Sequence, residues 1–493
     1  MDDAYGALAD RVARISYLRD AMGLLQWDQQ VTMPAGGTPA RSRQRGALSA
    51  VTHDLLTDDD VGAWLDAVED EELSADEAAV VREVRREYER ETAVPADLVE
   101  RLSERESDAQ ARWEDAKAAD DFDAFAPVLA DLRELRIERA DHVDPGGSAY
   151  ETLYDDQMPT LPYDTAMGIL ADLTEALPPL LQEIRESGDD LAQPFAGETV
   201  PAEAQAALSE ATLDLLGYDR EHGRLDTAAH PFTSGTQYDS RITTRYREDD
   251  PFDGLTATIH EFGHATYQLG LDRDAYGSPL GSARGEVHES QSRFWENHVG
   301  RSRAFWETFA PVFREHVPGA ADVSVDALHE RVNRVTPENC IRVEADELTY
   351  HLHIAVRAEI EREYVDGDLA TDEIPGRWRD LMDEYLGVVP ETDAEGALQD
   401  VHWTRRFGGF QTYTVGSVVA AQLTAAMRED LDLEGCIRDR AFDHLREWMT
   451  EHVHRHGQRY ETPELVERAT GDPPQADAFL EYVRGKFRPL YGL

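Results

Sequence analysis

The sequence predicts a mainly α fold, in the form of one large helical body that carries a small β-hairpin. Apolar residues recur at three- and four-residue spacing along most of the 493 residues, which is the period of a helix that buries one face. A chain of this length can form two or three domains, but its proline- and glycine-rich clusters are as short as turns and too short for linkers. We therefore expect a continuous helical body.

Long helices account for most of the chain in this prediction. Residues 75–117 and 354–389 are rich in glutamate and arginine and keep the helical repeat throughout. Residues 201–217 begin with proline and end at Gly217, as a capped helix does. These segments are expected to supply the core of the fold.

Residues 230–246 are the exception to the helical pattern. Gly235 separates two short runs there, and the second run is rich in β-branched and aromatic residues. A small β-hairpin is therefore expected in this segment.

The net charge is the second strong signal. The chain has 100 Asp and Glu residues against 48 Lys and Arg, a formal net charge of -52, and its only lysines are Lys117 and Lys486. Such an excess repels nucleic-acid phosphate and anionic lipid, so neither nucleic acid nor a membrane is expected as a partner. The near absence of lysine favours a surface adapted to molar salt, where repulsion is screened within about 3 Å, over an ordinary acidic protein.

No membrane or export signal is seen in the sequence. No run of about 18 apolar residues exists, and the first residues are acidic and amphipathic. Cys340 and Cys436 are too few for a disulfide framework and lack metal-ligand spacing. A cytoplasmic protein is therefore expected.

The helix predicted over residues 251–269 carries the motif H-E-x-x-H at His260, Glu261 and His264. The two histidines lie one turn apart, so both imidazoles can face one ion. Glu261 is rotated from His260 by about 100°, so it can reach a metal-activated water without being a ligand itself. The spacing predicts a metal site with its catalytic base.

A catalytic metal site needs a third protein ligand. One known pattern places a histidine six residues after His264, but position 270 is glycine, so a glutamate from a later helix is expected. Residues 283–300 offer Glu289, which shares a helical face with Arg293 and Glu296. Spacing alone does not choose Glu289 over its competitors, which are Glu286, His288, Glu296 and His298.

Six sequence blocks, in order along the chain, carry a family resemblance. They are H-P-F at His230 to Phe232, D-x-R-x-T at Asp239 to Thr243, HEFGH at His260 to His264, H-E-S-Q at His288 to Gln291, I-R-x-x-A-D at Ile341 to Asp346, and G-x-x-Q-D-x-H-W at Gly396 to Trp403. In these blocks the chain resembles the carboxypeptidase Taq (M32) family of metallocarboxypeptidases. The resemblance selects Glu289 as the third ligand beside His260 and His264.

The resemblance also implies a fold and an assembly. It implies a single domain over residues 1–493, almost wholly helical around a deep substrate groove, with the hairpin near an H-E-x-x-H plus Glu zinc site. It implies a homodimer with one Zn²⁺, or alternatively one Co²⁺, bound per chain. The implied activity is hydrolysis of single residues from the C-terminus of peptides.

This activity assigns roles to particular side chains. Glu261 is expected to be the general base. Arg342 is the first candidate to bind the terminal carboxylate and Arg241 the second, because a guanidinium binds a carboxylate bidentately. His402 and Tyr413 are candidates to donate a hydrogen bond to the tetrahedral oxyanion.

Other residues of the blocks have structural alternatives. His230 and Asp239 are candidate substrate contacts, but His230 can be a turn residue and Asp239 can brace its hairpin. Arg342 can simply pair with a neighbouring carboxylate. Asp346 can orient a metal-bound histidine.

The chain departs from the family pattern at one place. Gly409 and Gln411 stand where family members commonly have tyrosine and proline, which leaves a substrate contact by that tyrosine in doubt, although Tyr413 is kept. Two rival functions are an endo-acting zinc oligopeptidase of related helical fold and a non-catalytic scaffold. The position of peptide cleavage distinguishes the oligopeptidase from a carboxypeptidase. The intact base and metal ligands disfavour the non-catalytic scaffold.

Overall fold

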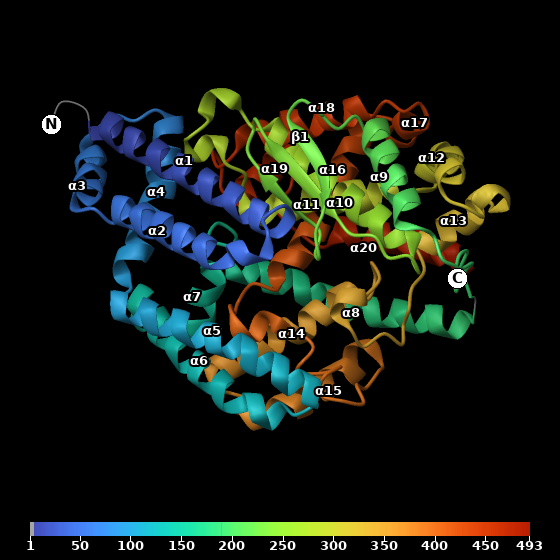
Figure 1. The fold of residues 1–493 in the computed structure, drawn as a ribbon, viewed down its shortest axis with the longest axis horizontal. Coiled ribbons are helices and arrows are strands. Elements are labelled where there is room, and N and C mark those ends of the chain that lie inside the picture. Colours follow the sequence, from blue (N-terminus) through green and yellow to red (C-terminus); the bar gives the residue numbers. More distant parts are fainter. Residues whose placement is uncertain (1–3, 189) are drawn as a thin grey trace. The chain divides into compact units, whose positions relative to one another are not determined.

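The computed structural model describes residues 4–188 and 190–493, and most of its elements are helices (Figure 1). In chain order the main elements are α1 (Ala4–Val31), α2 (Thr38–Leu56), α3 (Asp59–Ala67), α4 (Ala75–Ala93), α5 (Ala96–Ala119), α6 (Phe122–Val143), α7 (Ala149–Asp155), α8 (Tyr163–Ser187), α9 (Ala202–Leu216), β1 (Gly223–Thr227), β2 (Phe232–Gly235), β3 (Ser240–Thr244), α10 (Pro251–Gly270), α11 (Gly285–Arg293), a π-helix (Phe294–Gly300), α12 (Arg303–His316), α13 (Val325–Val332), α14 (Tyr350–Asp366), α15 (Ile374–Leu386), α16 (Gln411–Asp430), α17 (Leu433–Arg438), α18 (Phe442–His452), α19 (Thr462–Thr470) and α20 (Asp477–Leu490). The predicted mainly α fold is confirmed. Among the described helices, none combines the length and apolar character that a bilayer crossing requires.

The chain divides into two compact units. Unit 1 comprises the described residues of segments 1–91, 192–332 and 420–473, whereas unit 2 comprises those of segments 92–191, 333–419 and 474–493. Each unit is assembled from three separate stretches, so no single cut of the chain separates them, in keeping with the lack of a linker in the sequence. The single domain over residues 1–493 stays a prediction.

A three-stranded sheet in unit 1 contains the predicted hairpin. Strands β2 and β3 pair antiparallel, with Thr233 opposite Ile242, and β1 pairs parallel to the other edge of β3. The sequence analysis missed β1 because its residues, Gly-Arg-Leu-Asp-Thr, lack the alternation and β-branched run that mark a strand. Arg224 of β1 instead stacks over Trp27.

Helix α10 is anchored by its apolar face within unit 1. Phe262 is fully buried, 4.9 Å from Trp295 and 6.2 Å from Tyr218 between ring centroids, both in edge-to-face packing. Full burial of such a side chain stabilises the fold by about 1.5–3 kcal/mol. The polar residues of α10 are thereby held in a fixed rotation about the helix axis.

Unit 2 has its own core around α14 and α8. Leu170 of α8 packs with Ile354 and Ala358 of α14 and with Phe410. Arg357 of α14 is fully buried in this unit. The Cζ atom of its guanidinium lies 3.7 Å from the ring centroid of Trp403. A charged group therefore lies inside the apolar core.

Candidate metal centre

Helix α10 presents His260 and His264 on one face. Asp250 accepts a hydrogen bond from the backbone N–H of Phe252 and so caps the helix, and Pro251 follows at its start, as the sequence indicated. The imidazole centroids of His260 and His264 are 5.0 Å apart.

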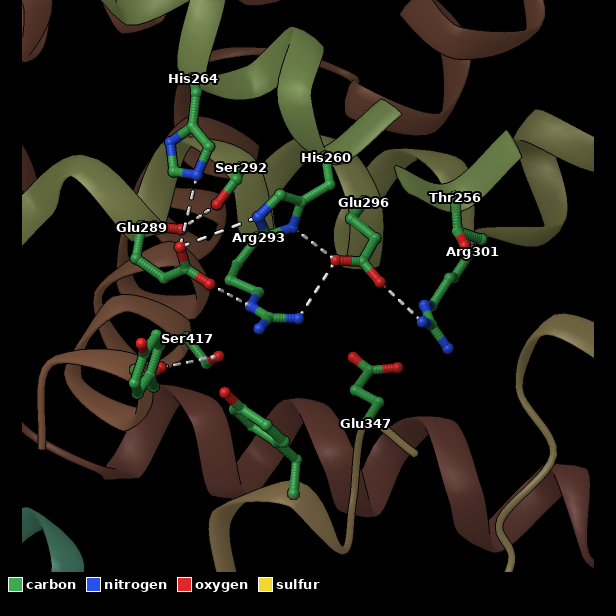
Figure 2. Close-up of polar contacts among 12 residues, drawn as sticks. Thr256, His260, His264, Glu289, Ser292, Arg293, Glu296, Arg301, Glu347 and Ser417 are labelled. Atoms are coloured by element: carbon green, nitrogen blue, oxygen red, sulfur yellow. Dashed lines mark hydrogen bonds and ion pairs between the residues drawn. The ribbon is translucent and has the colours of Figure 1, made fainter. Parts of the chain in front are cut away.

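Glu289 of α11 reaches between the two imidazoles (Figure 2). Its Oε2 lies 3.4 Å from Nε2 of His264 and 3.8 Å from Nε2 of His260. The candidate ligand atoms of the three residues lie within 4.8 Å of one another. The ligand set named from the sequence is therefore brought together in unit 1.

The set fits a divalent metal ion. Two histidines and one glutamate are a known catalytic zinc set, and donors about 2.0–2.1 Å from a tetrahedral ion lie about 3.4 Å from one another. The measured Nε2–Oε2 separations are close to this value.

Gly263 allows α11 to come this close to α10. A Cβ atom at this position would lie 2.5 Å from the carbonyl oxygen of Gln291 and from Cα of Ser292, both of which are main-chain atoms. The two backbones therefore pack without an intervening side chain. The glycine of the HEFGH block thus helps to place Glu289 opposite His264.

A second carboxylate supports His260 from the other side. Nδ1 of His260 lies 2.9 Å from Oε2 of Glu296, and Nη2 of Arg301 donates to Oε1 of Glu296 at 2.6 Å. Arg293 joins the two carboxylates, since Nε donates to Glu289 at 2.8 Å and Nη1 to Glu296 at 3.1 Å (Figure 2). A carboxylate that accepts from the distal nitrogen of a ligating histidine is a common outer partner at metal sites.

The local charges keep both glutamates ionised. Burial raises the pKa of Glu289, but Arg293 and the two histidines outweigh it and hold this pKa well below its ordinary value. Burial likewise raises the pKa of Glu296, and Arg301 and Arg293 bring it well below the usual range. Both carboxylates are therefore anionic at neutral pH.

Glu261 is held by the sheet. Glu261 is only 6% exposed. The hydroxyl of Thr233 in β2 lies 2.7 Å from Oε2 of Glu261 and 2.9 Å from its carbonyl oxygen. The hairpin thus contacts the H-E-x-x-H motif directly, as expected. Thr233 was not singled out from the sequence, because its register against α10 depends on tertiary packing.

Arg342 and His402 lie in unit 2, where both contact Asp400. The guanidinium of Arg342 donates to Asp400 through Nε at 2.9 Å and through Nη2 at 2.5 Å. His402 Nδ1 lies 3.5 Å from Oδ1 of the same carboxylate. Tyr413, also in unit 2, has its ring 5.9 Å from Arg342 Cζ. The carboxylate pairing that the sequence left open for Arg342 is therefore present.

Arg241 and Asp239 of unit 1 pair with each other. Arg241 donates to Asp239 through Nε at 2.9 Å and Nη2 at 2.6 Å, and its guanidinium stacks 4.3 Å above Trp27. Asp239 therefore braces the hairpin region, which was the structural alternative. His230 lies exposed in the turn before β2.

Asp346 braces its own loop in unit 2. It accepts hydrogen bonds from the backbone N–H groups of Thr336 and Thr349 and from the Thr349 hydroxyl. The distal nitrogens of the two candidate histidine ligands instead contact Glu296 and His288. The role predicted for Asp346 at the metal stays a prediction.

The two residues that depart from the family pattern are buried. Gln411 begins α16, and its Nε2 donates to the hydroxyl of Tyr150 at 2.9 Å. Gly409 is also buried. These two positions are therefore part of the packing of unit 2.

Comparison with known proteins shows the family of the chain. The family model described as carboxypeptidase Taq (M32) metallopeptidase matches residues 7–487. Thermostable carboxypeptidase 1 of Thermus thermophilus is 40% identical, covering 99% of both chains, and carboxypeptidase 1 of Bacillus subtilis is 35% identical, covering 98% of this chain and 97% of its own. The crystal structure of an M32 carboxypeptidase from Deinococcus radiodurans R1 has a TM-score of 0.95 at 36% identity, covering 99% of this chain and all of that chain.

The fold and these matches define a metal-dependent peptide hydrolase. The chain belongs to the carboxypeptidase Taq (M32) family. It is a metallocarboxypeptidase, which hydrolyses peptides from the C-terminus, and the carboxypeptidase prediction is confirmed over the endo-acting alternative.

Proposed function

We propose that this metallocarboxypeptidase binds one zinc ion per chain, with cobalt as a substitute, through Nε2 of His260, Nε2 of His264 and a carboxylate oxygen of Glu289. The main support is that the three donor atoms converge, while the remaining polar atoms of His260 and Glu289 contact neighbouring side chains. Glu296 contacts His260 Nδ1, and Arg293 contacts Glu289 Oε1. Such outer contacts orient ligands before the metal arrives.

The metal, when bound, would polarise the scissile carbonyl and lower the pKa of a water molecule toward 7. Glu261 takes a proton from the attacking water and passes it to the leaving amine. The hydrogen bond from Thr233 to Oε2 of Glu261 limits the rotation of this carboxylate. The base is therefore oriented by the sheet instead of by solvent.

Arg342 binds the terminal carboxylate of the peptide in this proposal. Asp400 engages the Nε and Nη2 edge of its guanidinium, which leaves the Nη1 and Nη2 edge able to donate to a second carboxylate. The hydroxyl of Tyr350 lies 3.4 Å from Nη1 on that edge. His402 and Tyr413 remain the candidates to donate to the oxyanion, and Arg241, His230 and Asp239 remain weaker candidates for substrate contact.

The assignment of Glu289 is tested by metal content. Glu289→Ala is expected to strip the metal, because a ligand is lost. Glu296→Ala should weaken binding by about 10- to 100-fold, because only an outer contact is lost. Metal per chain after dialysis against a weak chelator distinguishes them. If the Glu296 variant loses the metal and the Glu289 variant keeps it, Glu296 is the ligand.

We also propose that the protein is adapted to high salt and acts as a homodimer in the cytoplasm. The support for salt adaptation is the charge of -52 together with the use made of the two lysines. Lys117 donates to the carbonyl of Gln399 and Lys486 contacts Glu347, so both serve internal contacts. The dimer and the location rest on the family resemblance and on the sequence.

Lowering the salt concentration is expected to unfold the protein. In dilute buffer the screening length grows to about 30 Å, so carboxylates repel one another over the whole surface. We expect activity and the cooperative unfolding transition to be lost below a few tenths molar salt. Circular dichroism at stepped NaCl and KCl concentrations checks this, with sucrose as the uncharged control. Full stability in dilute buffer would contradict salt adaptation.

A further inference from the structure

His288 contacts the distal nitrogen of a candidate metal ligand. Its Nδ1 lies 2.7 Å from Nδ1 of His264, with the ring centroids 4.6 Å apart. We infer that His288 is a positioning residue that fixes the tautomer and the ring orientation of His264. The inference rests on the proposed binding of the metal through Nε2 of His264.

The direction of this hydrogen bond follows from the proposed ligation. Nε2 of His264 faces Glu289 and offers its lone pair to the metal, so the proton of the neutral ring is on Nδ1. Two nitrogens 2.7 Å apart share one proton, so Nδ1 of His288 is the acceptor. The proton of His288 is then on its Nε2.

Gln268 completes the chain of contacts. Its side-chain amide lies one helical turn after His264 on α10, with Nε2 placed 3.3 Å from Nε2 of His288. Two N–H donors cannot bond to each other, and an amide oxygen and nitrogen exchange places by a half-turn. The amide therefore turns its Oε1 toward His288. Donation runs from His264 to His288 and from His288 to Gln268.

The two histidine ligands are thus supported by different chemistry. His260 donates to a carboxylate, Glu296, which Arg301 and Arg293 neutralise. His264 donates to a neutral imidazole, so its support adds no charge beside the metal. The ring of Tyr267 lies 5.4 Å from that of His288 and limits its movement.

Two substitutions at His288 test the acceptor. Asn carries a polar atom where imidazole has Nδ1 and can turn its Oδ1 toward His264, whereas Leu has similar bulk and no acceptor. Affinity of the metal-free enzyme for Zn²⁺ is measured by competition with a chromophoric chelator. His288→Leu is expected to weaken zinc binding by about 10- to 100-fold and His288→Asn by less than about fivefold. Wild-type affinity in the Leu variant, or equal weakening in both, would overturn the inference.

Substitutions at Gln268 provide a second pair of variants, in which His288 itself is unchanged. Gln268→Leu removes the acceptor for Nε2–H of His288 and should weaken zinc binding about fivefold, while Gln268→Glu keeps an acceptor and should not weaken it. Equal affinities in these two variants would overturn the chain of donation. Thermal unfolding of each metal-free variant serves as the control for stability.

The role of His288 and the proposed binding of the metal by His264 are refuted by different results. Zinc retained at wild-type affinity by His264→Ala would refute the proposed ligation. Zinc lost from His264→Ala but bound normally by His288→Leu would refute only the role of His288.

Discussion

Glu261→Gln is expected to lower kcat/KM by at least about a hundred-fold while leaving the metal in place. Gln cannot take a proton from water, but it is the same size and still offers an oxygen to the Thr233 hydroxyl, which now contacts Oε2 at 2.7 Å. The loss should therefore be in the chemical step. Steady-state kinetics on a short peptide, with metal content by atomic absorption, measures both quantities.

Asp253→Asn is a matched control for this variant. It removes the same charge from the first turn of α10, where Asp253 pairs with Arg245. Activity close to wild type is expected, because surface pairs contribute little. Loss of the metal from Glu261→Gln would show that Glu261 is a ligand. An unchanged rate would show that it is not the base.

The sequence was sufficient for the parts of the site that lie within one helix. The cap at Asp250 and the apolar repeat fix α10, and the four-residue spacing fixes the relation of His260 to His264. The helix runs one residue beyond the predicted end and includes Gly270. A Cβ there would lie 2.4 Å from Nδ1 of His454, so this glycine serves close packing and not only termination.

The remaining parts depend on contacts between distant segments. Glu296 was expected only as a competing ligand, because periodicity places it on the face of Glu289 without showing which atom it meets. The acceptor for Thr233 and the partner of Arg342 lie 28 and 58 residues away along the chain. No local spacing encodes such pairs, so the outer contacts of the site appear only in the fold.

The charges around Arg342 favour the binding of one more carboxylate. Asp400 lies between Arg342 and Arg357, whose Nε is 3.6 Å from Oδ2 of Asp400. Burial raises the pKa of Glu361, which pairs with Arg357, to about 7. Two guanidinium groups thus face the carboxylate of Asp400 and that of Glu361, whose ionised form burial disfavours. A peptide terminus would bring one more carboxylate to these two guanidinium groups.

Amidation of the peptide terminus is therefore expected to lower kcat/KM by at least about thirty-fold. Arg342→Ala should lose a similar factor on the free acid and then discriminate little between acid and amide, because both changes remove one interaction. Arg241→Ala tests the second candidate for this carboxylate, and it should keep the discrimination of the wild type if Arg342 is the group that binds the terminus. Paired free-acid and amidated peptides, with products read by mass, measure the ratio in each protein. If Arg342→Ala keeps the wild-type ratio, another group binds the carboxylate; if Arg241→Ala loses it, that group is Arg241.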